Sequence, residues 1–280
     1  MILNIFQEIF KHKRANKSFG QHFLTNRGIV DKIAEAINDE DANICEIGPG
    51  TGSLTSGLIE KSTISNIVAI EKDESIVKLL NDNLHRLDKL NKVIGTDATH
   101  INWEEISKEH FQGDKVVMVS NLPYNYGTQI IYNIIKQYKH FKYLVVMLQK
   151  EVAEKIMATP GSSNYSKLST TCQIMCNISK IIHVSPGSFS PPPKVDSMVI
   201  KISIKPNIST EHMLARQIFN AGFINRRKTM RNNFKNSLTP EVISIIENEI
   251  DLGKRMETVS IDEVMRIATK LAEQGYSSIY

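Results

Sequence analysis

Short runs of hydrophobic residues recur along the first half of the chain, and stretches with helical spacing separate them. Such runs, rich in Val and Ile, are typical of strands buried on both faces of a parallel sheet. The predicted strands cover residues 43–47, 66–70, 93–94, 116–119 and 143–148. The helices expected around them begin after Thr25 or Asn26 and near residues 53, 73 and 128. This alternation predicts an α/β fold with a doubly wound, Rossmann-like parallel sheet.

The pattern changes near residue 205, where amphipathic helices replace the alternation of strands and helices. The predicted helices cover residues 211–223, 240–250 and 261–274. We therefore expect an α/β domain over residues 1–205, which opens with a basic segment at 1–27, and a smaller all-helical C-terminal domain over residues 206–280.

The composition is that of an ordinary soluble protein, with 280 residues of which 41% are hydrophobic and 23% charged. No hydrophobic run approaches the roughly 20 residues that span a bilayer, and the first ten residues lack a signal-peptide cleavage site. Three cysteines form no disulfide framework, and the spacing of Cys172 and Cys176 is more typical of core packing than of a metal site. We expect a cytoplasmic protein without membrane association or a bound metal.

The net charge is only +4, but two basic segments stand out from a slightly acidic remainder. Residues 1–27 hold five Lys or Arg against one Glu, and residues 211–236 hold six against one Glu. Two such segments favour a polyanionic partner such as nucleic acid, although each by itself is equally compatible with a solvated charged surface.

A glycine-rich turn, Gly48-Pro49-Gly50-Thr51-Gly52, follows the first predicted strand. Its third glycine comes one residue too early for the dinucleotide fingerprint, and with Glu46 it resembles the first motif of S-adenosylmethionine-dependent methyltransferases. Glu71 ends the next strand, where its carboxylate is placed to accept from two ribose hydroxyls. Asp97 follows the third strand and can accept from an adenine amino group, with the Ala98 amide facing the ring edge.

Asn121-Leu122-Pro123-Tyr124 ends a further strand, because Pro123 prevents continued pairing. The Asn121 carboxamide offers an acceptor and two donors, and Tyr124 offers a flat stacking face. Together they suit a planar heterocycle with an exocyclic amine. A plain turn with a half-buried Tyr is the alternative interpretation of these four residues taken alone.

Five motifs resemble those of the ribosomal RNA adenine N6-dimethyltransferase family, in the family's order and across nearly the whole chain. They are Phe19-Gly20-Gln21-His22-Phe23-Leu24, Glu46 to Gly52, Asn121 to Asn125, Leu148 to Ala153, and Phe189 to Ser197. The resemblance is greatest to the members that dimethylate two adjacent adenosines near the 3′ end of small-subunit RNA. It implies small-subunit RNA, or a 30S subunit precursor, as the partner, and we expect a monomer.

The resemblance implies S-adenosylmethionine as cofactor, with contacts from His22, Leu24, Gly48, Glu71, Asp97 and Asn121. The sequence departs from the family pattern in two motifs. His22 stands where Asn is common, and Asn125-Tyr126-Gly127-Thr128 replaces the more usual Asn-Ile-Ser-Thr.

The chemistry of methyl transfer to N6 assigns roles to four residues. Asn121 and the Leu122 carbonyl would accept the two N6 hydrogens, which stabilises positive charge as it grows on nitrogen. Tyr124 would stack on one face of the base and Phe189 would close the other. The alternative for Phe189 is a lid residue that packs on the domain core. Because N6 is inaccessible inside a duplex, the target adenine must be unpaired or flipped out.

In the C-terminal part, Asn225 to Asn232 resembles the Arg-rich segment of the family. Arg226, Arg227, Lys228 and Arg231 are expected to bind RNA phosphates. The alternative is that some of them pair with acidic groups of the protein itself.

Two other functions remain open at this stage. One is the erythromycin-resistance type of enzyme, which performs the same chemistry on large-subunit RNA. The other is a non-catalytic ribosome assembly factor that has kept a methyltransferase fold. Leu122, the proline run at residues 191–193 and the basic helical tail favour the small-subunit enzyme, and the intact cofactor positions disfavour pure binding.

Overall fold

The computed structural model describes residues 2–11 and 22–280 and divides the chain into two compact units. We call Met1–Ala153 with Ser179–Ile204 the sheet unit, and Glu154–Ile178 with Lys205–Tyr280 the helical unit. The chain enters the helical unit for the second time at residue 205, where the sequence pattern changes. The segment 154–178, which the sequence-based boundary leaves in the first domain, also belongs to the helical unit.

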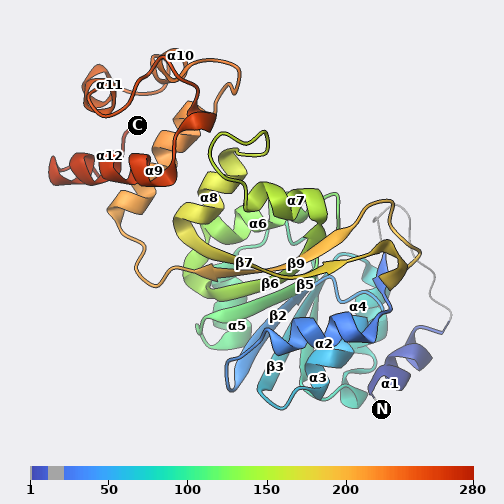
Figure 1. Cartoon of the computed structure of the whole chain (residues 1–280). Helices are drawn as coiled ribbons and strands as arrows, with labels where there is room; N and C mark the ends of the chain where they lie inside the picture. Colours follow the sequence, from blue (N-terminus) through green and yellow to red (C-terminus); the bar gives the residue numbers. More distant parts are fainter. Residues whose placement is uncertain (1, 12–21) are drawn as a thin grey trace. The chain divides into compact units, whose positions relative to one another are not determined.

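Within the described residues, the chain forms a seven-stranded sheet in the order β4-β3-β2-β5-β6-β9-β7, which belongs to the sheet unit except for the first three residues of β7 (Figure 1). The strands are β2 (Ala42–Ile47), β3 (Ile64–Glu71), β4 (Leu90–Gly95), β5 (Val116–Asn121), β6 (Phe141–Gln149), β7 (Cys176–Val184) and β9 (Ser197–Ile204). The five strands predicted from hydrophobic runs are all present and pair in parallel. β7 and β9 were not predicted, and β9 pairs antiparallel with β6, so the sheet is mostly rather than wholly parallel.

Helices cover both faces of this sheet, as a doubly wound fold requires. Figure 1 shows α2, α3 and α4 along one face and α5 and α6 along the other. The helices are α1 (Ile2–Ile9), α2 (Arg27–Glu35), α3 (Ser53–Glu60), α4 (Glu74–Asn81), α5 (Trp103–Phe111), α6 (Gly127–Lys136) and α7 (Lys150–Ile156), with 3-10 turns at Leu84–Arg86, Tyr138–His140 and Pro186–Ser188. A separate antiparallel pair joins β1 (Phe23–Leu24) to β8 (Phe189–Ser190).

Several helices differ from expectation: α5 and α7 were not predicted, and two further differences have identifiable reasons. α4 ends at Asn81 rather than near residue 87, and the Asn81 side chain pairs with both backbone groups of Val93 in β4. α1 was not predicted, and its Phe6 is buried against the glycine-rich turn. Much of the expected basic segment at 1–27, including Phe19, Gly20 and Gln21 of the first motif, lies outside the described residues.

The helical unit contains α8 (Lys167–Met175), α9 (Thr210–Gly222), α10 (Met230–Phe234), α11 (Pro240–Glu247), α12 (Ile261–Glu273) and a 3-10 turn at Met256–Thr258. The three helices predicted from the sequence in this region are confirmed, although α11 ends at Glu247 rather than at residue 250. Tyr165, Phe219 and Phe223 pack their rings together, with centroids 6.1 to 6.4 Å apart. Ser260 and Glu263 form a capping box that satisfies the first turn of α12.

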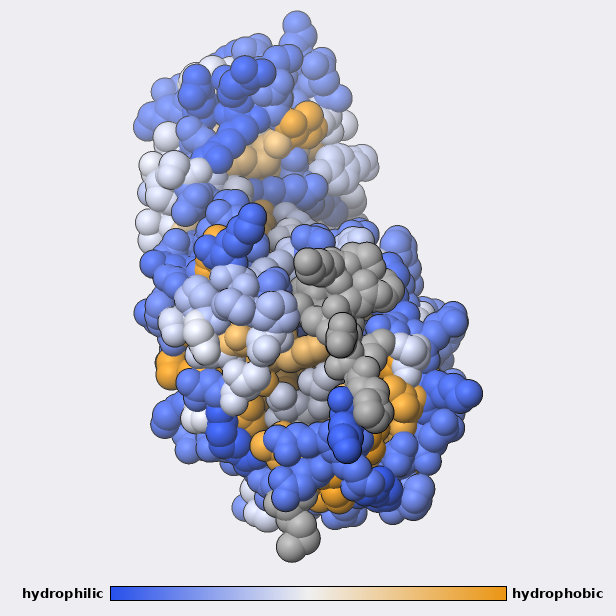
Figure 2. Space-filling model, turned by 90° about the vertical axis from the view of Figure 1, so that its right-hand side faces the viewer, coloured by the Kyte–Doolittle hydropathy of each residue, from blue (hydrophilic) through white to orange (hydrophobic). Residues whose placement is uncertain are grey.

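In Figure 2, hydrophobic residues form several patches on one face of the sheet unit, whereas the helical unit shows a mainly hydrophilic surface with a short hydrophobic strip. None of the helices in the described part of the chain has the length and hydrophobicity needed to cross a membrane. Within the same residues, no group of three or more His, Cys, Asp or Glu side chains is placed to hold a metal ion.

Candidate active site

The candidate site lies where the strand order reverses. β2 is flanked by β3 and β5, so the chain leaves β2 in one direction and later returns to its other side. Ligands of open α/β sheets bind at the carboxyl ends of the strands at such a point. The Ser120 hydroxyl donates to the Ile47 carbonyl at 2.5 Å and joins β5 to β2 there.

Two adjoining cavities open at this edge of the sheet. The larger cavity is lined by His22, Phe23, Leu24, Gly48, Pro49, Gly50, Thr51, Ser53, Leu54, Glu71, Lys72, Asn121, Leu122, Pro123, Tyr124 and Tyr126. The smaller cavity is lined by Ile47, Gly48, Ile70, Glu71, Lys72, Thr96, Asp97, Ala98, Thr99, Pro123, Tyr126 and Ile130. Because Gly48, Glu71 and Lys72 line both cavities, one elongated molecule can extend from one into the other.

The glycine-rich turn leaves room for such a molecule. Gly48 has φ +69°, and a Cβ added there would meet no protein atom within 4 Å. A side chain at this position would therefore fill space that belongs to the cavities. Gly52 has a different role, because a Cβ there would lie 1.9 Å from the Phe6 ring. The turn thus combines an open cradle with close packing of α1.

Glu71 is held rigidly at the end of β3. Its Oε1 accepts from the backbone amides of Lys72 and Asp73 at 2.8 and 2.9 Å, and its Oε2 accepts from the Gly50 amide at 3.3 Å. Burial raises the pKa of the carboxyl, and the backbone hydrogen bonds act in the opposite direction. The carboxylate has lone pairs left for hydroxyl donors, as expected for a group that binds a ribose.

Asp97 is held in a similar way after β4. Its Oδ1 accepts from the amide and the hydroxyl of Thr99 at 2.9 and 2.7 Å, and its Oδ2 accepts from Lys72 Nζ at 2.7 Å. Burial raises the pKa of Asp97, but hydrogen bonds from Lys72 and Thr99 outweigh it and lower the pKa to about 2. The carboxylate is therefore ionised at neutral pH and can accept only.

Asn121 and Tyr124 both line the larger cavity, and both contact His22. Asn121 Nδ2 donates to the His22 carbonyl at 3.1 Å, which orients the carboxamide. Its Oδ1 has no hydrogen-bond partner among residues 2–11 and 22–280. The Tyr124 hydroxyl bonds to Ser197 Oγ at 2.6 Å, and the His22 ring stacks on the Tyr124 ring at 5.4 Å. One face of Tyr124 is thus already covered by His22.

The structure brings most of the predicted site residues together, but not all of them. His22, Leu24, Gly48, Glu71, Asn121, Leu122 and Tyr124 line the larger cavity, and Asp97 and Ala98 line the smaller one. Phe189 lines neither cavity, because it is 4% exposed and pairs with Leu24 across β1 and β8. Lys72 and Tyr126 were not predicted, although Lys72 directly follows Glu71 and Tyr126 is one of the departures from the family pattern.

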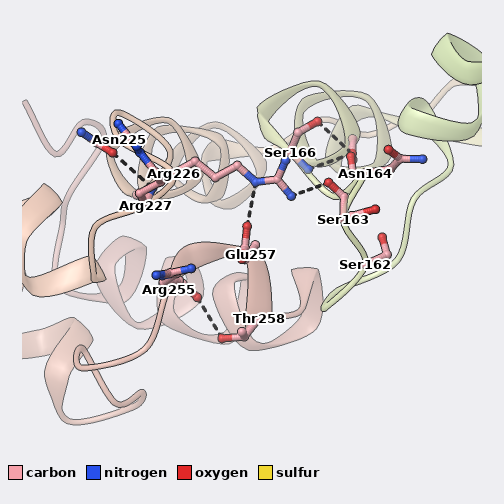
Figure 3. Close-up of polar contacts among 12 residues, drawn as sticks. Ser162, Ser163, Asn164, Ser166, Asn225, Arg226, Arg227, Arg255, Glu257 and Thr258 are labelled. Atoms are coloured by element: carbon pink, nitrogen blue, oxygen red, sulfur yellow. Dashed lines mark hydrogen bonds and ion pairs between the residues drawn. The ribbon is translucent and has the colours of Figure 1, made fainter.

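In the helical unit, Arg226 is engaged by the protein itself (Figure 3). Its Nε donates to Glu257 at 2.7 Å and its Nη2 donates to the Ser163 carbonyl. Gly161 N also donates to the Glu257 carbonyl at 2.7 Å. The guanidinium therefore ties the loop around Ser163 to the turn at Met256–Thr258.

The other three basic residues fall into two groups. Arg231 pairs with Glu247, although the Arg231 side chain is 55% exposed. Arg227 and Lys228 are exposed, and their side chains have no partner among the described residues. The buried Asn233 side chain shapes this turn, because it donates to Gly222 and Asn225 carbonyls and accepts from the Asn225 amide.

A mostly parallel sheet with a glycine cradle after one strand, and acidic groups after the next two, defines a nucleoside-binding fold of the methyltransferase class. The chain belongs to the ribosomal RNA adenine dimethylase family, whose model matches residues 12–273. The expected α/β fold and S-adenosylmethionine as cofactor are thereby confirmed. The open space at Gly48 and the fixed Glu71 carboxylate fit this cofactor.

Three relatives illustrate the likeness. A Pseudomonas fluorescens protein named ribosomal RNA small subunit methyltransferase A is 33% identical over 271 residues, which cover 95% of this chain and 96% of that protein. The crystal structure of a dimethyladenosine transferase from Plasmodium falciparum aligns with a TM-score of 0.72 and 26% identity, covering 91% of this chain and 98% of that one. The 23S rRNA methyltransferase ErmE shares the fold at a TM-score of 0.66 and 17% identity, covering 89% of this chain and 99% of that one.

Proposed function

We propose that this protein transfers methyl groups to N6 of two adjacent adenosines near the 3′ end of small-subunit ribosomal RNA, giving N6,N6-dimethyladenosines, during assembly of the 30S subunit. The observation that carries the proposal is the Asn121 carboxamide, whose oriented oxygen stands at a cavity shared with Gly48 and Glu71. The Pseudomonas relative, matched over nearly its full length, supports the small subunit as the source of the substrate.

The residues at the cavity act on the amine that is methylated. S-adenosylmethionine supplies an electrophilic methyl group when bound. In the first transfer, Asn121 Oδ1 and the Leu122 carbonyl accept the two N6 hydrogens and stabilise the positive charge that develops on nitrogen. In the second transfer, N6 carries a methyl group and one hydrogen, and one of these two acceptors binds that hydrogen. A new N–C bond forms as the S–C bond breaks, and the methylated ammonium then releases a proton to water. No side-chain base is required for this step.

Tyr124 is the proposed stacking surface for the flipped base. Because His22 covers one face of its ring, the base stacks on the opposite face or displaces His22. Phe189 was expected to complete the sandwich, and its buried position means that this role requires the β1–β8 pair to move. Stacking on aromatic rings is typical of single-stranded base recognition.

For RNA binding, we assign phosphate contacts to Arg227 and Lys228, whose charges are not paired within the described residues. Arg226 pairs with Glu257 and Arg231 pairs with Glu247. These two arginines therefore stabilise the local structure and contribute less to phosphate binding. The proposal further includes a cytoplasmic monomer that requires no metal, since the methyl group is already activated on sulfur. Light scattering on the purified protein and turnover after treatment with a chelator test these two points.

The decisive experiment incubates unmethylated small subunits, and separately large subunits, with the protein and methyl-labelled cofactor, and then maps the label. Two adjacent dimethylated adenosines near the 3′ end of the small-subunit RNA are expected. Label on the large subunit alone would identify the erythromycin-resistance type of activity. Binding to small subunits without any label would identify a non-catalytic assembly factor.

A further inference from the structure

Lys72 occupies the junction of the two cavities. It follows Glu71 at the end of β3 and lines both cavities, as does Tyr126 from the turn before α6. Lys72 Nζ lies 2.7 Å from Asp97 Oδ2 and 5.3 Å from the centroid of the Tyr126 ring. A charged side chain at this junction is in the path of any ligand that extends from one cavity into the other.

The hydrogen bonds of Asp97 show why the position of Lys72 affects ligand binding. Thr99 donates two hydrogen bonds to Oδ1, from its amide and its hydroxyl, and these fix the orientation of the carboxylate. Thr99 therefore fills both acceptor positions of Oδ1, and Lys72 occupies one of the two positions on Oδ2. The adenine amino group, in the role assigned to Asp97, must bind at Oδ2 beside or in place of the Lys72 ammonium.

We infer that Lys72 competes with the adenine amino group of the cofactor for Asp97 and thereby lowers the affinity of the protein for the cofactor. When adenine binds, the Lys72 ammonium moves away from Asp97 and stays over the face of the Tyr126 ring, because aromatic rings attract cations. The Lys72–Asp97 pair is a screened surface pair, with the side chains 48% and 35% exposed. Its displacement is therefore a modest cost, equivalent to at most about a fivefold change in affinity. The inference rests on the proposed adenine role of Asp97.

The test measures binding of S-adenosylhomocysteine by calorimetry. Lys72→Met keeps the hydrophobic stem and removes the charge, and it should bind the ligand about two- to fivefold more tightly than the wild type. Lys108→Met is the matched control, because it removes another exposed lysine paired with a carboxylate, on α5 away from both cavities. It should leave the affinity unchanged. Unchanged or weaker binding by Lys72→Met overturns the inference.

Salt provides a second readout without a mutation. Screening weakens an exposed ion pair, so the affinity of the wild type should rise between about 0.05 and 0.5 M salt, toward that of Lys72→Met. The affinity of Lys72→Met should change little over this range. A salt response shared equally by both proteins contradicts the competition.

A double-mutant cycle separates this inference from the role on which it depends. Asp97→Asn turns the fixed acceptor into a donor toward the adenine amine and should weaken binding at least tenfold. In that background Lys72→Met should have no further effect. Normal binding by Asp97→Asn would refute the adenine role of Asp97. Failure of the wild-type protein to bind S-adenosylhomocysteine would refute the assignment of the cofactor site itself. An equal gain from Lys72→Met in both backgrounds refutes the competition alone.

Discussion

Replacing Asn121 with alanine is the sharpest perturbation that the structure allows. The side chain stands at the end of β5 and makes one hydrogen bond, from Nδ2 to the His22 carbonyl at 3.1 Å. In the proposed mechanism, its Oδ1 accepts from the substrate amine. On that proposal, Asn121→Ala removes one structural hydrogen bond and one acceptor for the reacting nitrogen.

The two losses differ in size. A neutral hydrogen bond contributes about 0.5–1.5 kcal/mol to folding, a small part of the roughly 5–15 kcal/mol that stabilises a typical domain. Loss of one group that stabilises transition-state charge lowers kcat by about 10²–10³, equivalent to about 2.7–4 kcal/mol. The variant should thus be folded and nearly inactive. Its affinity for S-adenosylhomocysteine should change only severalfold, because Gly48, Glu71 and Asp97 are untouched.

The assay is single-turnover methylation of unmethylated small subunits at saturating cofactor, with calorimetric binding of S-adenosylhomocysteine and a thermal melt alongside. Asn102→Ala is the matched control. Asn102 caps α5 by accepting from the Glu104 amide at 3.1 Å, so its removal costs stability of about 1 kcal/mol without touching either cavity. The reasoning is refuted if Asn121→Ala retains a kcat within tenfold of the wild type.

Three further predictions follow from particular contacts. Tyr124→Ala should lower methylation at least tenfold more than it lowers cofactor affinity. Tyr124→Phe loses only the bond to Ser197 and should stay close to the wild type in both properties. Equal loss of methylation and cofactor affinity in Tyr124→Ala would exclude stacking. Arg227→Ala should reduce the slope of log affinity for RNA against log salt concentration by about one and leave the melting temperature unchanged. Arg226→Ala should instead lower the melting temperature, because it breaks the ion pair with Glu257. The reverse outcome would exchange the roles of the two arginines. Glu46 is 1% exposed, and burial raises the pKa of its carboxyl to about 8, although the nearby Thr55 side chain acts in the opposite direction. The native state then binds a proton that the unfolded state has lost, so stability should fall as pH rises from about 4.5 to 8, and Glu46→Gln should flatten this dependence in urea titrations.

The sequence by itself determined the framework of the site. Val- and Ile-rich runs identified the five parallel strands, because strands buried on both faces can hold little else. Since parallel strands present their carboxyl ends at one edge of the sheet, residues that follow different strands had to meet there. Gly48, Glu71, Asp97 and Asn121 are far apart in sequence, and this rule alone places them around adjoining cavities. The resemblance to the family motifs then predicted S-adenosylmethionine as the cofactor.

The tertiary structure decided which groups are available for chemistry. No local pattern in the sequence indicates that Lys72 holds Asp97, that His22 covers Tyr124, or that Phe189 is buried against Leu24. The same is true of Arg226, whose partner Glu257 lies 31 residues away along the chain. Hydrophobic periodicity reports which face of an element is buried. Pairing between exposed polar side chains depends instead on which distant segments the fold brings within hydrogen-bond reach, and that is settled only when the chain is packed.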